Sequence, residues 1–400
     1  MITPRRWFTC TPRDYEGGPG FFTRDSGLVC RGLQMMGVET RAVLTGSPRE
    51  GDEREILRAD LNELESPGWW QRQGLDGVVL YAWGRPRYRK VASAIRKAGV
   101  FLILNQDSGG LVSPLAGFRQ WVSEQWVLAG QGQDAAACWR FAKKVGRGLT
   151  WGLIFTDPLR AWHLWQGDVI SCVSPVAVAN YRRLCRAYGG RKLVSRVRLL
   201  PHPVEERFLH DGRLKQRRIV CVGRWDDLLQ KRPDLMMAVL ARVLLEDAGV
   251  EAEIIGRETP ELSTWRNSLE SNIARRLRLR GSLDRAELAN AMAAAQVFYS
   301  PSAYESFGIA AGEALCSGCS VVAGRSISMA SFDWFVAAAS GTLADSSSVD
   351  DHVAALHAEL ADWADGRRDP GEISATWTKQ LYASRVASAA LAFRDGNALA

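Results

Sequence analysis

The segment Pro301–Gly324 (PSAYESFGIAAGEALCSGCSVVAG) restricts the possible folds of this chain more than any other. An apolar strand, Val297–Ser300, leads into it and is followed by a tight polar turn. A helix is predicted to open near Ser306–Gly308, and a second apolar strand covers Ser320–Ala323. Two strands joined through a helix are neighbours in a parallel sheet, so the chain is predicted to hold α/β units.

Two glutamates mark this segment: Glu305 lies just before the helix, and Glu313 lies about a turn and a half inside it. A helix N-terminus offers unpaired N–H groups and a partial positive charge, which suit a phosphate. With a rise of ~1.5 Å per residue, Glu313 falls ~7 Å beyond that terminus, about the offset between a diphosphate and its ribose. The residues between the glutamates are small enough for a ligand to lie against the helix: Gly308, Ala310, Ala311 and Gly312.

Glu313 could instead lie on a solvated helix face, with Gly318 as an ordinary helix C-cap. Its neighbours Ala311, Gly312, Ala314 and Leu315 are small or apolar, however, and a carboxylate is costly to bury there without a partner. This setting favours a ligand site over a solvated face.

The composition is that of a globular protein. A chain of 400 residues is longer than a typical single domain, so two domains are expected. The net charge of +7 suits phosphorylated substrates or an anionic membrane surface, and no nucleic-acid partner is expected. The sequence holds no run of 18 apolar residues, and its N-terminus lacks the apolar stretch of a signal peptide.

The eight cysteines are scattered and most lie in apolar runs, where a free thiol behaves as a small hydrophobe. Cys316 and Cys319 form a C-x-x-C at a helix end, but no second pair or histidine cluster completes a zinc site. Buried packing is therefore the preferred interpretation. Free thiols indicate a reducing compartment, so a cytoplasmic location is expected.

Strands and helices alternate along both halves, which predicts parallel sheets covered by helices on both faces. In the first half, strands are predicted at Arg6–Thr11, Glu39–Leu44, Gly77–Tyr81, Val100–Asn105, Asp168–Val173 and Val197–Leu200. The pattern breaks around Pro201–Arg218, which is interpreted as a linker. The predicted domains are 1–205 and 206–375, with a last helix (about Thr376–Arg394, in 376–400) that packs back on the first domain.

Ligands of open parallel sheets bind beyond the carboxyl ends of the strands, and four loops lie at such ends. Tyr15–Phe21 is rich in glycine, which permits a close backbone approach or simply makes a surface loop. Gln106–Gly110 carries Asp107, either facing a ligand or serving as a turn residue. Gly223–Lys231 carries Arg224 and Lys231, which complement a diphosphate. The fourth is the glutamate segment.

With these loops in place, the chain resembles the retaining GT-B glycosyltransferases, the large group 1 (family 4-like) set that uses nucleotide-sugar donors and carries two glutamates eight positions apart. The likeness lies in VCVGRW at 220–225, EIIGRE at 253–258 and the whole run 281–324. In the first half, GGPGFF at 17–22 and DVISCVSP at 168–175 are similar to the family more loosely. The resemblance implies a GT-B architecture, with two Rossmann-like domains facing across a cleft.

The resemblance also implies roles for the matched residues. Arg224 and Lys231 would bind the donor diphosphate, Glu305 the sugar hydroxyls, and Glu313 the ribose hydroxyls. Asp107 stands, after Gln106, where the family has a histidine, and is placed with Glu305, Arg224 and Lys231 among the catalytic residues. The remaining donor-binding residues implied are Gly17, Gly18, Gly223, Ser282, Leu283, Ser306, Phe307, Gly308 and Ile309, with Gly281 near the base.

The implied reaction moves a hexose with retention from a UDP- or GDP-sugar to a hydroxyl of a glycan, glycolipid or small molecule, as in polysaccharide biosynthesis. No cofactor or essential metal is expected, since no Asp-x-Asp motif follows a strand, and Asp226-Asp227 is interpreted as solvated. The alternative is a GT-B-fold protein that binds nucleotide sugar without transfer or acts as an epimerase.

The segment 116–165 is unusual because six tryptophans lie among basic residues that include Arg140, Lys143, Lys144, Arg147 and Arg160. It is an amphipathic surface for a membrane or lipid-linked acceptor, an aromatic platform for sugar rings, or a helix pair packed on the sheet with exposed basic ends. The last, simplest interpretation is preferred, and peripheral contact at the inner membrane face stays open. The tryptophans are Trp121, Trp126, Trp139, Trp151, Trp162 and Trp165.

Overall fold

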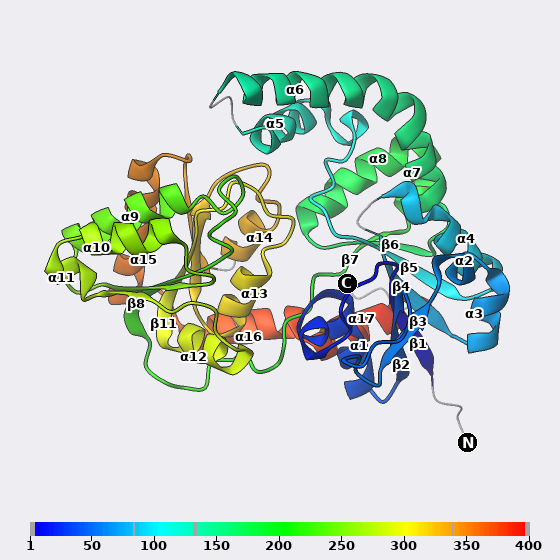
Figure 1. Cartoon of the computed structure of the whole chain (residues 1–400), viewed down its shortest axis with the longest axis horizontal. Helices are drawn as coiled ribbons and strands as arrows, with labels where there is room; N and C mark the ends of the chain where they lie inside the picture. Colours follow the sequence, from blue (N-terminus) through cyan, green and yellow to red (C-terminus); the bar gives the residue numbers. More distant parts are fainter. Residues whose placement is uncertain (1–4, 83–84, 131–133, 338, 397–400) are drawn as a thin grey trace. The chain divides into compact units, whose positions relative to one another are not determined.

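A computed structural model of the chain describes residues 5–82, 85–130, 134–337 and 339–396 (Figure 1). The chain divides into two compact units. Residues 1–205 and 381–400 form the first unit, and residues 206–380 form the second. Each unit is built around one parallel sheet, as the alternation of strands and helices predicts.

The first unit holds a seven-stranded sheet in the order β3-β2-β1-β4-β5-β6-β7. Neighbouring strands pair in parallel; for example, Trp7 of β1 lies opposite Thr40 of β2 and Gly77 of β4. The strands are β1 (Arg6–Thr11), β2 (Glu39–Thr45), β3 (Ile56–Ala59), β4 (Gly77–Tyr81), β5 (Phe101–Gln106), β6 (Val169–Cys172) and β7 (Val197–Leu199).

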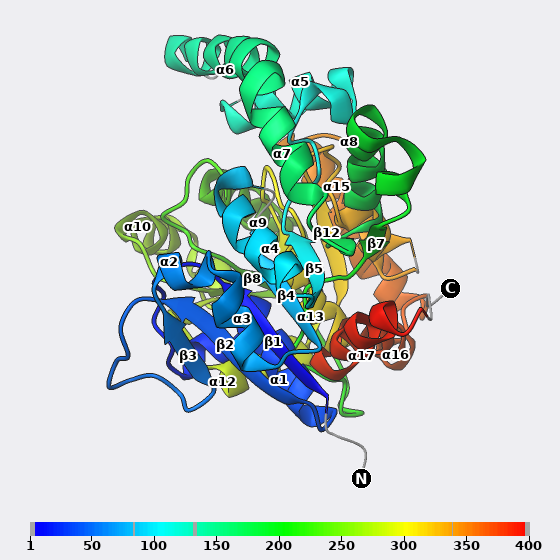
Figure 2. The ribbon, with the colours of Figure 1, turned by 90° about the vertical axis from the view of Figure 1, so that its right-hand side faces the viewer.

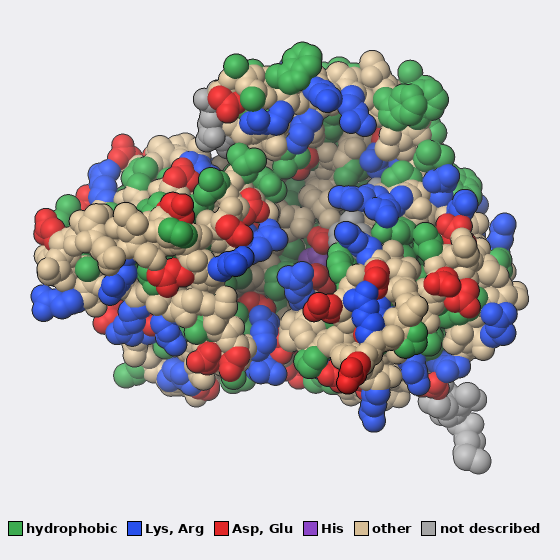
Figure 3. All heavy atoms as spheres, in the orientation of Figure 1, with side chains coloured by type: hydrophobic (Ala, Val, Ile, Leu, Met, Phe, Trp, Pro, Cys, Tyr) green, Lys and Arg blue, Asp and Glu red, His purple; other side chains and the backbone are tan. Residues whose placement is uncertain are grey.

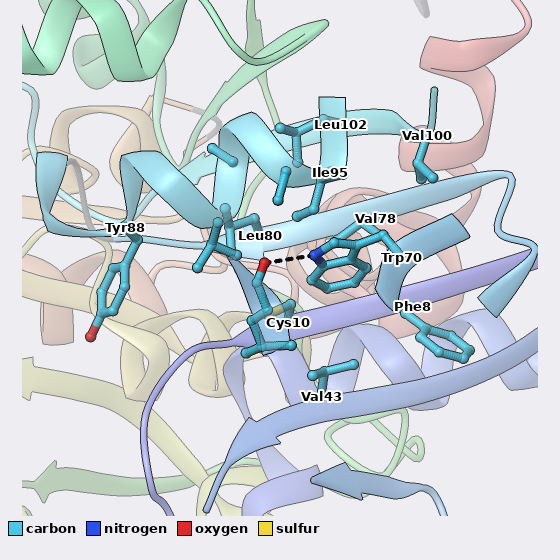
Figure 4. Close-up of a cluster of buried hydrophobic side chains, with 14 of the residues drawn as sticks. Phe8, Cys10, Val43, Trp70, Val78, Leu80, Tyr88, Ile95, Val100 and Leu102 are labelled. Carbon is cyan, nitrogen blue, oxygen red and sulfur yellow. Dashed lines mark hydrogen bonds between the residues drawn. The ribbon is translucent and has the colours of Figure 1, made fainter. Parts of the chain in front are cut away.

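Helices cover both faces of this sheet. The helices of the first unit are η1 (Pro19–Thr23), α1 (Asp25–Met35), α2 (Leu61–Leu64), α3 (Pro67–Gln73), η2 (Pro86–Tyr88), α4 (Arg89–Lys97), η3 (Pro114–Ala116), α5 (Phe118–Leu128), α6 (Ala135–Arg147), η4 (Gly148–Thr156), α7 (Asp157–Leu164), α8 (Pro175–Val194) and α17 (Ala383–Arg394). On one face, α3 and α4 bury Trp70 and Ile95 against Phe8, Val78 and Leu80 (Figure 4). The indole N–H of Trp70 donates to the Leu64 carbonyl at 2.8 Å, the dashed line of the figure.

On the other face, α1 lies beside α17, the last helix of the chain (Figure 1; Figure 2). Val29 and Leu33 of α1 share a core with Val386 and Ala390 of α17. The single helix predicted over Thr376–Arg394 is wrong: α16 (Pro370–Leu381) ends before Tyr382, and α17 begins after it. The backbone at this break pairs with Val204, whose N–H donates to Leu381 and whose carbonyl accepts from Ala383, at 2.7 and 3.0 Å.

The preferred interpretation of 116–165, a helix pair packed on the sheet, is also wrong. In α6 the only buried residue among those described is Ala137, in α5 it is Trp121, and η4 has none. The segments α5, α6 and η4 form a helical hairpin. Trp121 packs within this hairpin, where its ring leaves no room for a side chain on Gly148. Trp126 and Phe141 meet edge to face at 5.1 Å and join α5 to α6. The pair therefore packs on itself, and its outer faces stay uncovered.

The second unit holds a six-stranded parallel sheet in the order β10-β9-β8-β11-β12-β13. Its strands are β8 (Gln216–Val222), β9 (Glu251–Ile255), β10 (Leu277–Leu279), β11 (Ala295–Ser300), β12 (Ser320–Gly324) and β13 (Gly341–Ala344). Its helices are α9 (Pro233–Glu246), α10 (Pro260–Ser268), α11 (Ser271–Ala274), α12 (Arg285–Ala294), α13 (Ile309–Cys316), α14 (Phe332–Val336), α15 (Val349–Ala364) and α16.

Part of the predicted linker is structured. His202 is buried in the first unit, and Phe208 is buried in the second. The basic cluster at 213–218 is held by partners within the second unit; Arg217 pairs with Asp247, and Arg218 pairs with Glu251. The cluster thus anchors β8 instead of forming a free basic surface.

All eight cysteines are free, and seven of them, including Cys316 and Cys319, are buried. Cys319 donates through its thiol to the Met292 carbonyl at 2.9 Å. The interpretation of the C-x-x-C as buried packing is confirmed. Within the described ranges, no helix is both long enough and apolar enough to cross a membrane.

In both sheets the strand order reverses beside the first strand of the unit. β1 lies between β2 and β4, and β8 lies between β9 and β11. Open α/β sheets bind ligands outside the carboxyl ends of their strands at such a reversal. The candidate ligand-binding loops are therefore those after β1 and β4 in the first unit, and those after β8 and β11 in the second.

Candidate functional site

In the second unit, the loops after β8 and β11 are joined side by side at the reversal of strand order. The N–H of Ala303 donates to the Gln230 carbonyl at 2.8 Å, and the Gln230 amide donates to the Tyr304 carbonyl at 3.1 Å. The predicted basic loop and the predicted glutamate segment therefore form one surface, although they lie more than 70 residues apart in the sequence.

Lys231 and Glu305 form an ion pair at this surface. Both side chains are largely buried, at 18% and 12% exposed, and the Ser302 hydroxyl donates to the same carboxylate at 3.1 Å. The backbone of Glu305 is fixed as well, because its N–H donates to the Ser328 carbonyl at 2.8 Å. Lys231, seven residues after Arg224, thus brings its ammonium group to the glutamate.

Arg224 differs from Lys231 because its side chain is 71% exposed. Its guanidinium donates to Asp227 and to the Gln230 amide oxygen, both at 3.3 Å. Asp227 also accepts from the backbone N–H of Gln230 at 3.1 Å. The interpretation of Asp226-Asp227 as solvated holds for the exposed Asp226 and is wrong for Asp227, which shapes the loop.

The helix after Glu305 begins at Ile309, slightly later than predicted. Gly308 precedes it with φ +83°, in the left-handed region, and a Cβ there would lie 2.9 Å from the Phe332 ring. Phe307 is buried with its ring edge-on to Phe335 at 5.3 Å, and the Ser306 carbonyl accepts from the Ser331 hydroxyl. These contacts hold the backbone of 306–309 at the N-terminus of α13, where helix N–H groups lack intrahelical partners.

Glu313 is buried in α13, so the solvated-face alternative is excluded. Its partner comes from the chain itself: the Arg285 guanidinium lies 2.5 Å from its carboxylate, and Arg285 also stacks over the Phe208 ring at 4.7 Å. Sequence reasoning missed Arg285. It lies at the start of α12, 28 residues before Glu313, and no local pattern connects the two positions.

Two glycine turns lie next to one another at the ends of β8 and β9. A Cβ on Gly256, whose φ is +130°, would lie 1.9 Å from the Gly223 carbonyl oxygen. The Trp225 indole donates to the Ile255 carbonyl at 3.0 Å and packs against Gly223. Gly223 therefore has a packing role in addition to any ligand contact.

The predicted base-binding residues lie in the loop between β10 and α12. Gly281 has φ +61°, and its carbonyl accepts from the Gly256 N–H at 2.8 Å. Ser282 is exposed, and Leu283 is half-buried. The loop is therefore tied to the turn after β9, beside the Gly223 turn.

The first unit has a cavity of about 680 Å³ at the carboxyl ends of its strands. Thr11 ends β1, Tyr81 ends β4 and Asp107 follows β5, and all three line the cavity together with Gly18. Gly17 has a different environment: a Cβ there would meet Asp52 at 2.5 Å and Ile56 at 2.7 Å. Of the two predicted glycines, Gly18 faces the cavity, and Gly17 is required for packing.

Asp107 is joined to His202, which sequence reasoning placed in the linker. His202 Nε2 lies 2.9 Å from Asp107 Oδ1, and Nδ1 lies 3.5 Å from Asp25 Oδ1. Burial lowers the pKa of His202, but the carboxylates of Asp107 and Asp25 outweigh it, so the pKa is raised above its usual value. The three groups offer ligand atoms within 4.8 Å of one another, and a cation here would compete with the imidazole for both carboxylates.

Two Rossmann-like units in one chain define the GT-B class of fold, and solved structures match it over nearly the whole length. The apo lipopolysaccharide outer core galactosyltransferase WaaB is 14% identical with a TM-score of 0.63, covering 98% of this chain and 99% of that one. Anabaena Alr3699/HepE in complex with UDP is 12% identical with a TM-score of 0.63, covering 98% and 100%. A glycosyltransferase from Rickettsia africae is 10% identical with a TM-score of 0.61, covering 99% of both.

Residues 216–362 match the family described as "Glycosyl transferases group 1". The second unit therefore carries a group 1 glycosyltransferase domain, and the predicted fold and enzyme class, a GT-B glycosyltransferase, are confirmed. Among curated protein sequences, none matches this chain significantly.

Proposed function

We propose that this chain transfers a hexose, with retention of configuration, from a nucleotide sugar to a hydroxyl group of an acceptor. The observation that carries the proposal is the Lys231–Glu305 ion pair, which lies at the reversal of strand order in the glycosyltransferase domain. A cation and a carboxylate side by side can hold the two parts of a nucleotide sugar, its diphosphate and its sugar hydroxyls.

The proposed donor is a UDP-sugar. Its support is the likeness in fold to HepE, whose structures hold UDP and UDP-glucose. In the proposed complex, the diphosphate lies at the N-terminus of α13, where the N–H groups of Phe307, Gly308 and Ile309 favour a negative charge. Lys231 has three N–H donors, so it can keep its bond to Glu305 while donating to a phosphate oxygen.

Arg224 and Glu313 have further roles in the proposal. The exposed Arg224 can leave Asp227 for the diphosphate, since an exposed ion pair contributes little stability. Glu313 would accept from the ribose hydroxyls, with Arg285 fixing its carboxylate. Ser282 and Leu283 would lie near the base.

In the proposed reaction, the acceptor oxygen attacks the anomeric carbon on the face from which the diphosphate departs. The bond from that carbon to the phosphate oxygen breaks, and the acceptor's proton passes to the departing phosphate. Lys231, Arg224 and the α13 N-terminus would stabilise the charge that grows on the leaving group. No metal or protein base has a step in this scheme, and positioning of donor and acceptor supplies the rest.

The acceptor is assigned to the first unit. The cavity of about 680 Å³ is lined by Asp107 and Gly18, two of the predicted site residues. Its size suits one or two sugar rings, and Asp107 would accept from a hydroxyl there. A glycan, a glycolipid and a small molecule all present such a hydroxyl.

The proposed location is the cytoplasm, a reducing compartment, which agrees with the eight free cysteines.

The test is to incubate the full chain with UDP- and GDP-sugars and to measure nucleotide release. We expect release from one donor and a loss of about a hundredfold or more in Glu305→Ala. No release or binding with any donor, together with no effect of Glu305→Ala, overturns the proposal. Anomeric analysis of the product separates retention from inversion, and an epimerised sugar without acceptor would support the epimerase alternative.

A further inference from the structure

An apolar stripe runs along η4 and α7 with its side chains in solvent. Its five members are exposed by 41–64%: Trp151, Ile154, Phe155, Leu159 and Trp162. The rings of Trp151 and Phe155 lie 4.2 Å apart, which places them on one face. Large exposed apolar patches mark interaction surfaces, so this stripe is a candidate interaction surface.

The stripe faces outward because the opposite side of α7 is fixed in the first unit. Ala161, His163 and Leu164 are buried there, and Asp157 is buried with Arg160 as its ion-pair partner. Phe155, Leu159 and Trp162 follow at intervals of four and three residues, the spacing of one helix face. A rotation that hides the stripe would therefore expose the buried side of the helix.

Positive charge accompanies the stripe. The stretch from 135 to 156 contains no aspartate or glutamate and holds Arg140, Lys143, Lys144 and Arg147. The nearest acidic groups are Asp134, which caps the far end of α6, Glu124 on α5 and the buried Asp157. Figure 3 shows hydrophobic side chains over the end of α6, where the chain bends toward α7, with Lys and Arg side chains along the adjoining face.

The positive surface continues into a second cavity of the first unit, of about 510 Å³. Arg85, Lys144 and Arg147 line it, together with Glu124, and Gly148 at the start of η4 borders it. The buried Arg160 of α7 lines this cavity as well, so the cavity lies on the side of α7 away from the stripe. The basic helix α6 and the stripe on η4 adjoin along the chain at Arg147–Gly148.

We propose that this face of the hairpin, the stripe on η4 and α7 with the basic residues of α6, docks on an anionic lipid bilayer. Aromatic and aliphatic side chains enter the boundary between headgroups and acyl chains, while Lys and Arg meet the lipid phosphates. A symmetric pair of copies fits less well, because the interface would gather the cations of both copies while the stretch 135–156 offers no carboxylate to pair with them. The proposal does not depend on the proposed transferase reaction, since docking needs no sugar donor.

The test uses the full chain and sedimentation with phosphatidylcholine vesicles, either pure or with 30% phosphatidylglycerol, a composition chosen as about that of a moderately anionic membrane. The variant Trp151→Ser/Ile154→Ser/Phe155→Ser removes the stripe, and Lys143→Gln/Arg147→Gln removes two charges. The matched control, Met35→Ser/Leu214→Ser/Leu245→Ser, removes three other exposed apolar side chains. Circular dichroism and thermal melting confirm that each variant is folded.

We expect the wild type and the control to bind the anionic vesicles, and to bind the neutral ones weakly. The stripe variant should bind at least about tenfold less, and the charge variant about thirtyfold less, with a loss that shrinks as salt is raised. Absence of wild-type binding, or unchanged binding in the stripe variant, overturns the proposal. A wild-type dimer in ultracentrifugation that the stripe variant dissociates, without vesicle binding, would instead assign the face to a second copy.

Discussion

His202 Nε2 lies 2.9 Å from Asp107 Oδ1, which joins the segment after β7 to the loop after β5. The imidazole is buried, and Asp25 lies on its other side at 3.5 Å. Its pKa is raised by these carboxylates, and the protonated form of the imidazole would hold Asp107 in place at the cavity. Because Asp107 lines the proposed acceptor cavity, the charge state of His202 connects pH to the shape of that site.

The first prediction concerns the pH dependence of folding. The raised pKa of His202 means that its stabilising contribution is fully present below the usual histidine value of 6.5 and is lost as pH rises through the folded value. His202→Gln should therefore be less stable than the wild type at pH 5.5, with a difference that shrinks toward pH 9. Urea unfolding of both proteins across this pH range measures the difference in their free energies of unfolding. A difference that does not vary with pH contradicts the prediction.

The second prediction tests the Lys231–Glu305 pair. Lys231→Met removes the ammonium while keeping most of the apolar stem, so transition-state stabilisation of the leaving group should fall. We expect nucleotide release to slow by about 100- to 1,000-fold, with no such effect in the exposed control Lys379→Met. If Lys231→Met keeps activity within about twofold while Glu305→Ala abolishes it, Lys231 has no role in the reaction.

The third prediction concerns the buried carboxylate of Glu313. Arg285→Met removes its cation and leaves the charge buried, which should destabilise the second unit by about 3–5 kcal/mol. The double variant Arg285→Met/Glu313→Gln should recover much of this loss, because a neutral amide is cheaper to bury than a carboxylate. Denaturant unfolding of the single and double variants measures the coupling. If Arg285→Met leaves the free energy of unfolding unchanged, the ion pair does not stabilise the fold.

Sequence reasoning located the central strands because helices cover both of their faces, which makes them short apolar runs. It missed β3 and β13, two of the four edge strands. In Ile56–Ala59 only the two end residues are buried, and in Gly341–Ala344 only Ala344 is, so neither strand reads as an apolar run. It also misread the hairpin at 116–165, because an amphipathic helix has the same pattern whether its apolar face meets a sheet or solvent.

In the site, the residues found from sequence share local signals, such as a basic loop after one strand and a helix start after another. His202 and Arg285 have no such signal, because each meets its partner only through the tertiary fold. A buried carboxylate predicts that a partner exists and does not identify it. This explains why Glu313 was placed in a ligand site while its guanidinium partner was missed.

The last prediction concerns Gly308, which sets the start of α13. An alanine there must adopt φ +83° and bring its Cβ to 2.9 Å from the Phe332 ring. Gly366 is a matched control, because its φ is +69° and a Cβ there meets nothing within 4 Å. Both alanine variants should lose about 1–2 kcal/mol for the left-handed backbone, and Gly308→Ala should lose more because of the clash.

Gly308→Ala should also weaken donor binding, since relief of the clash moves the backbone that would hold the diphosphate. Thermal unfolding of both variants, followed by nucleotide-sugar titration, separates the two effects. Equal losses of stability in the two variants would show that the Phe332 ring moves aside at no measurable cost. If donor affinity also stays at the wild-type value, the N-terminus of α13 does not hold the phosphate, because a shift of this backbone changes every N–H donor aimed at it.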